Sequence, residues 1–314
     1  MNILITCPPM IQRIMEYDSL FKKYNLNYHC PKFTQVMSEE DLIKIVPKYD
    51  GWIIGDDPAT KKVFMAGKKN KLKAAVKWGV GVDNVDFESC EQLEIPIANV
   101  PNVFGEEVSD VAIGMLLNLT RKLHIIDSET KKGIWYKPCG TSLSDKKACL
   151  IGFGNIGQSI ARKLLAFNIS VWAYDPYYIA SIDNTNTKLS NVKLDKFDTC
   201  MKGADFIFIA CALTDSSKYL IRKDTVKLAN KGVKIINVAR GPIIKENDIV
   251  ELLEDCFVDA VGFDVFEIEP LPMESKLRNF PQNIYGSHNG SNTIEAVDRT
   301  SKIAIEKMVQ FLSK

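Results

Sequence analysis

Long hydrophobic runs are missing from this chain of 314 residues, and the longest uninterrupted apolar stretch extends only from Phe206 to Leu213. A transmembrane helix needs about 20 apolar residues, so we expect no membrane span. Residues 1–7 lack the charged start and the long apolar core of a signal peptide, so we expect no export. An excess of one charge is also missing, since 40 Lys and Arg oppose 39 Asp and Glu. This balance gives no reason to expect nucleic acid or an anionic membrane as a partner.

Paired cysteines and clustered histidines are also lacking. The chain has eight cysteines without a CxxC pair, and three histidines, none at metal-ligand spacing from another. We therefore expect neither a disulfide scaffold nor a bound metal. Cys149 and Cys211 lie in apolar runs, which is typical of buried thiols. Without an export signal, this cysteine usage predicts a reducing cytoplasm.

What the sequence does contain is an alternation of strand and helix patterns. Hydrophobic residues make up 46% and charged residues 25% of the chain, and its length suggests about two globular domains. Continuous apolar runs between amphipathic stretches suit strands buried on both faces of a parallel sheet. We therefore predict a doubly wound α/β fold. The predicted strands are residues 3–6, 52–54, 72–78, 149–152, 170–174, 206–212, 233–238, 260–265 and 284–287.

Two longer helices are predicted where the chain would pass between its domains. One covers about residues 106–122 and the other about residues 293–312. Asn292 is the expected N-cap of the second helix, in a capping box with Glu295. We infer that the N-terminal segment and the last helix build one domain. The predicted domains are residues 1–99 with 288–314, and residues 100–287.

A glycine-rich segment follows the predicted strand at 149–152. Gly152, Gly154 and Gly157 have the spacing GxGxxG and open a helical pattern, the context that a dinucleotide-binding fingerprint requires. Gly152 permits the tight turn, Gly154 lets the backbone approach a pyrophosphate, and Gly157 lets helix and strand pack closely. The phosphates would lie on the helix N-terminus, where unpaired N–H groups favour anions. The alternative is an ordinary glycine-rich turn.

The next predicted strand ends in Asp175, 18 residues after Gly157. A carboxylate at this place can accept hydrogen bonds from a ribose diol and would repel a 2′-phosphate. No arginine follows in residues 175–178. The sequence therefore predicts NAD rather than NADP as the cofactor.

Three further polar residues, Arg240, Glu269 and His288, follow later strands, where α/β sheets bind ligands. Their chemistry suits oxidation of a secondary alcohol, in which carbon loses a hydride and oxygen loses a proton. His288 can take the proton, and Glu269 can orient the ring and stabilise the imidazolium. Arg240 can bind a carboxylate or carbonyl oxygen. Each residue alone also has an ordinary interpretation: His288 as a surface histidine, Glu269 as a solvated loop charge and Arg240 as an ion-pair partner.

The chain resembles the NAD-dependent D-isomer-specific 2-hydroxyacid dehydrogenases over nearly its full length. The segments that carry the resemblance are residues 77–86, the Gly152 loop, and residues 237–241, 264–270 and 287–290. It implies two Rossmann-like domains with the active site in the interdomain cleft.

The same resemblance implies site residues. His288 is the acid/base, Arg240 is the substrate clamp, and Glu269 is the partner of His288, although Glu267 is nearer to the strand. Backbone N–H groups at Gly79, Val80 and Gly81 would hold the substrate carboxylate. Besides the three glycines, the implied cofactor contacts are Asn155, Ile156, Asp175, Val238, Ala239 and Asp264.

The branch that the chain most resembles is the D-3-phosphoglycerate dehydrogenases, so 3-phosphoglycerate and 3-phosphohydroxypyruvate are the leading substrates. Many of these enzymes carry an arginine–serine pair for the phosphate where this chain has Asp56 and Asp57, which would repel it. Lys61, Lys62 or Lys77 could compensate, but we expect them on a solvated face. The alternative is a glyoxylate or hydroxypyruvate reductase.

Two further alternatives are weaker. Formate dehydrogenases share the fold, but their chemistry needs no proton acceptor and they carry glutamine at the position of Glu269. A few relatives are NAD-sensing interaction proteins, such as transcriptional corepressors, but nothing beyond the catalytic set favours that reading here. The resemblance also implies a homodimer formed through the cofactor domain. The broad apolar face of residues 106–122, with the small Gly114, is the expected contact.

Overall fold

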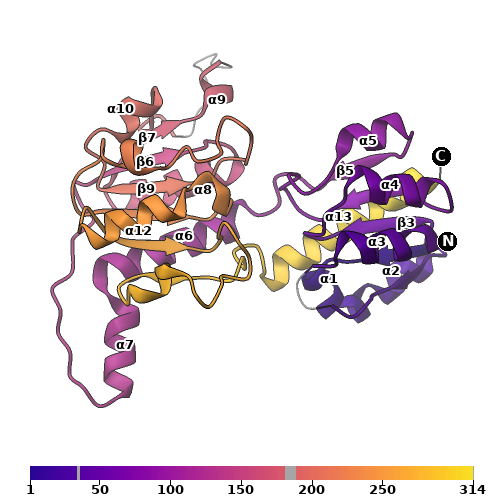
Figure 1. The fold of residues 1–314 in the computed structure, drawn as a ribbon, viewed down its shortest axis with the longest axis horizontal. Coiled ribbons are helices and arrows are strands. Elements are labelled where there is room, and N and C mark those ends of the chain that lie inside the picture. The colour runs from indigo at the N-terminus through magenta and orange to yellow at the C-terminus, as the bar shows by residue number, and fades with distance from the viewer. Residues whose placement is uncertain (34–35, 181–188, 314) are drawn as a thin grey trace. The chain divides into compact units, whose positions relative to one another are not determined.

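A computed structural model describes residues 1–33, 36–180 and 189–313, and the chain divides into two compact units (Figure 1). Unit 1 comprises Met1–Val103 and Asn292–Lys314, and unit 2 comprises Phe104–Ser291. Each boundary is a few residues beyond the one expected from sequence. No helix in the described residues is both long enough and apolar enough to cross a membrane.

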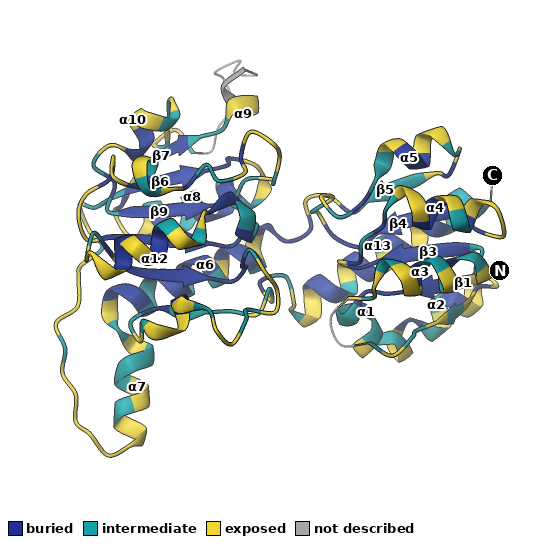
Figure 2. Ribbon diagram, viewed as in Figure 1, coloured by how far each residue is buried: buried dark blue, intermediate teal, exposed yellow. Residues whose placement is uncertain are grey.

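Unit 1 is built on a parallel sheet with the strand order β2-β1-β3-β4-β5. Residues of β1, β3 and β4 are almost completely buried, as expected for strands covered on both faces (Figure 2). The strands are β1 (Asn2–Ile5), β2 (Asn27–His29), β3 (Gly51–Ile54), β4 (Ala74–Lys77) and β5 (Ile97–Asn99). The helices are α1 (Pro8–Gln12), α2 (Asp18–Lys23), α3 (Glu39–Ile45), α4 (Lys61–Lys68), α5 (Phe87–Gln92) and α13 (Ile294–Leu312).

Helix α13 returns the chain to unit 1 and packs against β3 and β4. The contact is close, because a Cβ added at Gly51 would lie 2.6 Å from the sulfur of Met308. The expected Asn292 cap is wrong by one residue. Thr293 is the N-cap, and its hydroxyl accepts a hydrogen bond from the Ala296 N–H. A threonine hydroxyl serves this purpose as well as an asparagine side chain does, so composition alone did not separate the two positions.

Unit 2 is built on a parallel sheet with the order β12-β11-β10-β9-β6-β7-β8. This is the dinucleotide-binding strand order, with one strand added at an edge. The predicted doubly wound α/β class is confirmed. The strands are β6 (Lys147–Ile151), β7 (Ser170–Tyr174), β8 (Lys193–Leu194), β9 (Phe206–Ile209), β10 (Val233–Asn237), β11 (Val258–Phe263) and β12 (Ile284–Tyr285). The helices are α6 (Gly105–Arg121), α7 (Leu123–Lys131), α8 (Asn155–Ala166), α9 (Pro176–Ala180), α10 (Phe197–Met201), α11 (Lys223–Val226) and α12 (Glu246–Glu254).

Helix α6 buries its apolar face inside unit 2, against α8, β10 and β11. A Cβ at Gly262 of β11 would lie 2.9 Å from Met115 of α6, so the helix sits directly on the sheet. The face that the sequence suggested for dimerisation is therefore used in the core of its own unit. Lys122 then adopts a left-handed conformation (φ 55°), and α7 continues as a projecting helix without a buried residue (Figure 1).

Candidate active site

The turn after β6 has the geometry of a phosphate-binding loop. Gly152 has φ +94°, and a Cβ there would lie 2.6 Å from the backbone nitrogen of Cys211. A Cβ at Gly157 would lie 2.1 Å from the carbonyl oxygen of Gly152. Any side chain at either position would therefore force the β6–α8 turn apart, which is the physical reason for both glycines.

Gly154 differs from the other two glycines because it faces open space. No atom lies within 4 Å of a Cβ built there, and Gly154 is the N-cap of α8 with no side chain bonded to the helix end. The first N–H groups of this 12-residue helix are thus available to an anion, and the helix dipole favours one. This cradle fits the pyrophosphate of a dinucleotide, with Asn155 and Ile156 in the first turn.

Asp175 connects this loop to the end of β7. One carboxylate oxygen accepts the N–H of Phe153 at 2.8 Å, and the other accepts the N–H groups of Tyr177 and Tyr178 at 3.0 and 3.1 Å. These bonds fix the carboxylate beside the phosphate cradle. A carboxylate has about four acceptor sites, so lone-pair capacity remains for a ribose hydroxyl.

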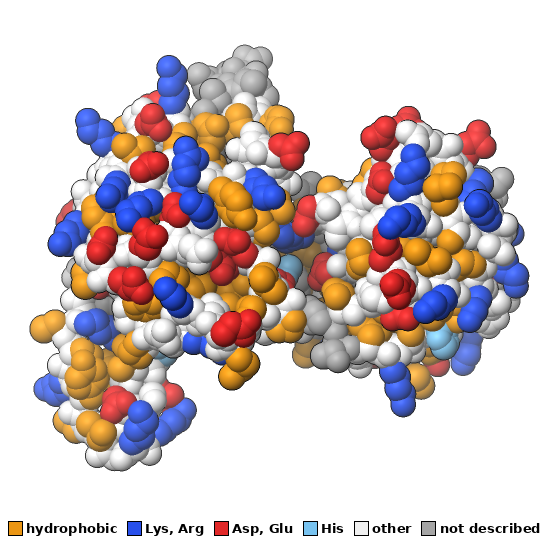
Figure 3. Space-filling view, viewed as in Figure 1, with side chains coloured by type: hydrophobic (Ala, Val, Ile, Leu, Met, Phe, Trp, Pro, Cys, Tyr) orange, Lys and Arg blue, Asp and Glu red, His pale blue; other side chains and the backbone are white. Residues whose placement is uncertain are grey.

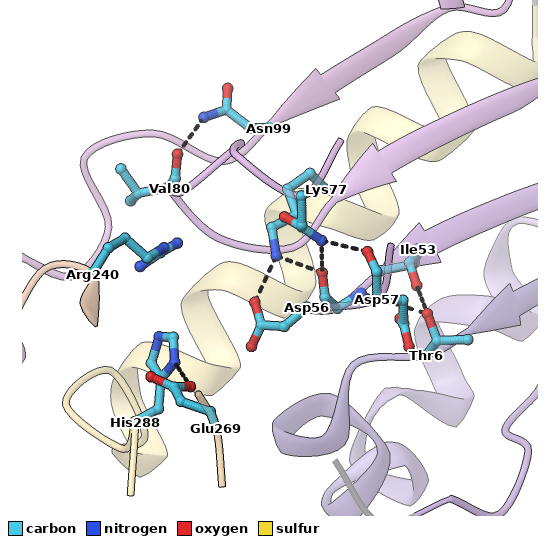
Figure 4. Close-up of polar contacts among 12 residues, drawn as sticks. Thr6, Ile53, Asp56, Asp57, Lys77, Val80, Asn99, Arg240, Glu269 and His288 are labelled. Carbon is cyan, nitrogen blue, oxygen red and sulfur yellow. Dashed lines mark hydrogen bonds and ion pairs between the residues drawn. The ribbon is translucent and has the colours of Figure 1, made fainter. Parts of the chain in front are cut away.

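Arg240, Glu269 and His288 come together at the carboxyl edge of the same sheet, after β10, β11 and β12 (Figure 4). The Nδ1 of His288 lies 2.8 Å from the Oε2 of Glu269, while Oε1 of Glu269 accepts the Phe266 N–H at 2.9 Å. The His288 and Glu269 side chains are 25% and 27% exposed, so solutes can reach them. The pair has the arrangement in which a carboxylate orients an imidazole through one ring nitrogen.

The turn that carries His288 is held by Asp264, at the end of β11. His288 has φ +55°, and its N–H donates to the backbone carbonyl of Asp264 at 2.7 Å. The buried carboxylate of Asp264 also accepts the N–H groups of Asn289 and Gly290, at 3.1 and 2.8 Å. The sequence resemblance suggested a cofactor contact for Asp264. In the structure its hydrogen bonds stabilise the turn that aims the imidazole.

The turn that carries Arg240 is organised by Asn237, which is completely buried. The Asn237 amide donates to the Arg240 carbonyl at 2.9 Å and accepts the Ala239 N–H at 3.0 Å. Val238 and Ala239 form the body of this turn, and Nη1 of Arg240 donates to the Ala239 carbonyl. An asparagine at the end of an apolar run, followed within four residues by Arg240 and Gly241, was a signal in the sequence for such a turn.

In unit 1, the loop after β4 holds the residues from which the sequence predicted a carboxylate site. Gly79 has φ +110°, its carbonyl accepts the Val100 N–H at 3.0 Å, and the Asn99 amide donates to the Val80 carbonyl at 3.0 Å. In the described part of the chain, the N–H groups of Val80 and Gly81 have no hydrogen-bond partner. They are therefore available to an anionic ligand.

The loop after the neighbouring strand β3 contains Asp56 and Asp57. Nζ of Lys77, at the end of β4, lies 2.9 Å from Oδ1 of Asp56 and donates to the Gly55 carbonyl (Figure 4). Lys77 is 2% exposed, so the expectation that it lies on a solvated face is wrong. β3 and β4 are paired, and the ammonium of Lys77 has to be buried to reach the Asp56 carboxylate at the end of the neighbouring strand. Asp57 is fully buried, and burial is the main cause that raises the pKa of its carboxyl group.

The sequence analysis did not predict the pairings Glu246–Glu267 and Asp264–Gly290 in the site region. They join residues 21 and 26 positions apart, and both depend on the meeting of separate loops. Among the described residues, no group of three or more His, Cys, Asp or Glu side chains has the arrangement of a metal site.

Known proteins share this architecture. Residues 113–290 match the family model described as D-isomer specific 2-hydroxyacid dehydrogenase, NAD binding domain. The chain is 33% identical over 281 residues to hydroxypyruvate reductase of Thermotoga maritima, a match that covers 88% of this chain and 89% of that protein. It is 30% identical over 291 residues to D-3-phosphoglycerate dehydrogenase of Bacillus subtilis. That match covers 88% of this chain but 54% of the longer relative.

A solved structure gives the same result for the fold and the cofactor. The NAD-dependent formate dehydrogenase from Staphylococcus aureus in complex with NAD superposes with a TM-score of 0.85 and 25% identity, over 99% of this chain and 96% of that one. These findings confirm the family and the cofactor expected from sequence. The chain belongs to the D-isomer-specific 2-hydroxyacid dehydrogenase family and is an NAD-dependent dehydrogenase.

Proposed function

We propose that this enzyme reduces small, unphosphorylated 2-oxo acids such as hydroxypyruvate or glyoxylate to the corresponding 2-hydroxy acids, as the D isomer where the product is chiral, with NADH as the hydride donor. One feature carries the choice of substrate: the Asp56 carboxylate, which pairs with the buried Lys77, falls where the resemblance to phosphoglycerate dehydrogenases puts their phosphate-binding arginine–serine pair. A carboxylate there repels a phosphate dianion. The T. maritima relative, which matches over most of its length, is named a hydroxypyruvate reductase.

The lysines that could have offset this repulsion are already engaged. Lys77 is held by Asp56 and the Gly55 carbonyl. Lys62 pairs with Glu39 at 3.2 Å, and Lys61 donates to the side chain of Gln92 at 3.3 Å. Lys61 and Lys62 are exposed, and an ion pair at an exposed ammonium gains little in water, so they add little to phosphate binding.

The proposed chemistry assigns one role to each residue of the site. The nicotinamide, when bound, gives or accepts the hydride. Protonated His288 donates a proton from Nε2 to the carbonyl oxygen during reduction, and neutral His288 accepts it during oxidation. Glu269 holds Nδ1 and stabilises the imidazolium. Arg240 binds the carbonyl oxygen or carboxylate, and the N–H groups of Val80 and Gly81 bind the carboxylate.

The second candidate is interconversion of D-3-phosphoglycerate and 3-phosphohydroxypyruvate. It is favoured by the B. subtilis relative, which is named a D-3-phosphoglycerate dehydrogenase, although the match covers 54% of that protein. Assays of kcat/KM with NADH and hydroxypyruvate, glyoxylate or 3-phosphohydroxypyruvate separate the two. We expect the unphosphorylated acids to be preferred by at least tenfold, about 1.4 kcal/mol. Preference for 3-phosphohydroxypyruvate would overturn the proposal.

We also propose a homodimer, formed through unit 2. Helix α7 and the segment after it present large apolar side chains to solvent: Leu123, Ile134, Trp135 and Tyr136 are 48%, 51%, 83% and 44% exposed. Figure 3 shows hydrophobic side chains among charged ones on this projection. Exposed apolar surface of this kind is typical of an interface. Light scattering at micromolar concentration should report about twice the 35.3 kDa of one chain; a persistent monomer would contradict the dimer.

We place the enzyme in the cytoplasm. All eight cysteines are unpaired thiols, as in a reducing compartment. Burial raises the pKa of Cys211 to about 12 and that of Cys149 well above its usual range, so both thiols are unreactive at neutral pH.

A further inference from the structure

The loop between β11 and Pro270, residues 264–270, contacts every catalytic turn of unit 2. Glu269 reaches His288 directly, and Asp264 holds the His288 turn. A Cβ at Gly241, next to Arg240, would lie 1.8 Å from the carbonyl carbon of Phe266. The position of this loop therefore sets the position of Glu269 relative to the imidazole.

We propose that Glu246 and Glu267 form a carboxylate clasp that positions Glu269 against His288, a role that rests on the proposed acid/base function of that pair. Glu246 is the first residue of α12, and Glu267 lies two residues before Glu269. Neither glutamate touches the reacting groups, so both are positioning residues.

The clasp is reciprocal. The Glu246 N–H donates to Oε1 of Glu267 at 2.7 Å, and the Glu267 N–H donates to Oε1 of Glu246 at 2.6 Å. The hydroxyl of Tyr219 donates to the second oxygen of Glu267 at 3.3 Å. Each backbone N–H thus has a charged acceptor, the stronger class of hydrogen bond. Two such bonds fix both the distance and the angle between loop and helix.

Retaining two facing carboxylates has an electrostatic cost. Burial is the main cause that raises the pKa of Glu246, and the charges of Glu267 and Glu269 raise it further, while the Glu267 N–H opposes the shift. The N-terminus of α12 offsets part of this repulsion, because a helix N-terminus favours negative charge. If the position of this loop did not matter, replacing one of the two carboxylates by a neutral side chain would remove the repulsion and stabilise the fold more.

The clasp acts on one member of the acid/base pair only. The imidazole turn is anchored at the other end of this loop, where Asp264 directly follows β11 and holds the turn through its carboxylate and carbonyl. Glu269 has its other anchor inside its own loop, at the Phe266 N–H. A loosened clasp should therefore displace Glu269 from His288 and leave the phosphate cradle at Gly152 unchanged. The expected defect is in kcat, with little change in KM.

The test uses the full-length enzyme with NADH and hydroxypyruvate. We expect Glu267→Ala and Glu246→Ala each to lower kcat by on the order of tenfold, with KM and NADH affinity changed less than about twofold. Glu267→Gln and Glu246→Gln keep an acceptor oxygen, so we expect them to restore kcat to within about threefold of wild type. Asp248→Ala is the matched control. It removes a carboxylate on the same helix that accepts the Lys223 N–H at 2.9 Å but does not touch the loop, and it should leave kcat unchanged.

The outcomes separate this inference from the proposed function. If His288→Ala loses activity while both alanine variants keep wild-type kcat, the clasp has no positioning role. Equal losses in the Ala and Gln variants, or a loss in KM rather than kcat, would also overturn it. If an alanine variant does not fold, the remaining alanine variant and both Gln variants still decide the question. Full activity of His288→Ala would instead refute the acid/base assignment.

Discussion

The two parallel sheets carry different kinds of groups at their carboxyl ends. In unit 2, the loops after β7, β10, β11 and β12 present charged side chains fixed by hydrogen bonds, and the loop after β6 adds the backbone N–H groups of the phosphate cradle. In unit 1, the loop after β4 presents backbone N–H groups, and the loop after β3 presents Asp56 against a buried lysine. The difference suggests that unit 2 performs the chemistry shared by the family, while unit 1 selects the substrate.

The largest expected effect is at the acid/base. His288→Ala should lower the rate of hydride transfer by about 10²–10⁴, the usual contribution of a positioned acid/base. The expected loss is in kcat, because the imidazole acts on the reacting oxygen. Turnover is measured with hydroxypyruvate and NADH, alongside a thermal melt. If His288 and Glu269 only held a loop, His288→Ala would lower the melting temperature, and kcat of the folded fraction would remain near normal.

A smaller effect is expected on the preference for NADH over NADPH. Wild type should bind NADH at least ten times more tightly than NADPH, since Asp175 would repel a 2′-phosphate. Asp175→Ala should narrow this gap, but it also removes the acceptor of the Phe153 N–H, so some loss of NADH affinity accompanies it. Fluorescence titration of both cofactors measures the ratio. Equal affinity of the two cofactors for wild type would contradict the assignment.

The features that could be predicted from the sequence differ between unit 2 and unit 1. The glycines of the β6–α8 turn, Asp175 and the three polar residues after later strands are local patterns, so the fold class and cofactor were predictable. Asp56–Lys77 joins residues of two neighbouring loops, and Lys77 looked like a surface lysine because most lysines are exposed. Periodicity shows that a face of α6 is buried but does not identify what covers it, and the structure shows that most of this face is covered within unit 2.

Substitution of Asp56 tests the role of unit 1 in substrate selection. Asp56→Asn keeps the size of the side chain and removes one charge, so the ratio of kcat/KM for 3-phosphohydroxypyruvate over hydroxypyruvate should rise by roughly three- to tenfold. The control is Lys62→Ala, which alters an exposed ion pair in the same unit and should leave the ratio unchanged. An unchanged ratio in Asp56→Asn would remove Asp56 from substrate selection.

The smallest effect is on stability in unit 1. Burial raises the pKa of Asp57, so the folded chain disfavours its charged form. The resulting loss of stability is absent well below pH 3.8, where the carboxyl group is protonated in both the folded and the unfolded chain, and it develops as pH rises through the raised pKa of the folded state. Asp57→Asn retains an acceptor for the Met37 N–H and should raise Tm by roughly 2–4 °C at about pH 8, with little gain at about pH 3. Melting curves at both values measure it; a gain that is larger at the lower pH would contradict the sign.

The central claim is that unit 2 performs the chemistry and unit 1 selects the substrate. Single-turnover, stopped-flow measurement of NADH oxidation tests it most directly, with hydroxypyruvate and 3-phosphohydroxypyruvate at matched concentrations. The account predicts that His288→Ala slows hydride transfer to both substrates by the same large factor, while Asp56→Asn changes only the ratio between them. A near-normal rate constant for His288→Ala, or a ratio that changes with His288 rather than with Asp56, would contradict it.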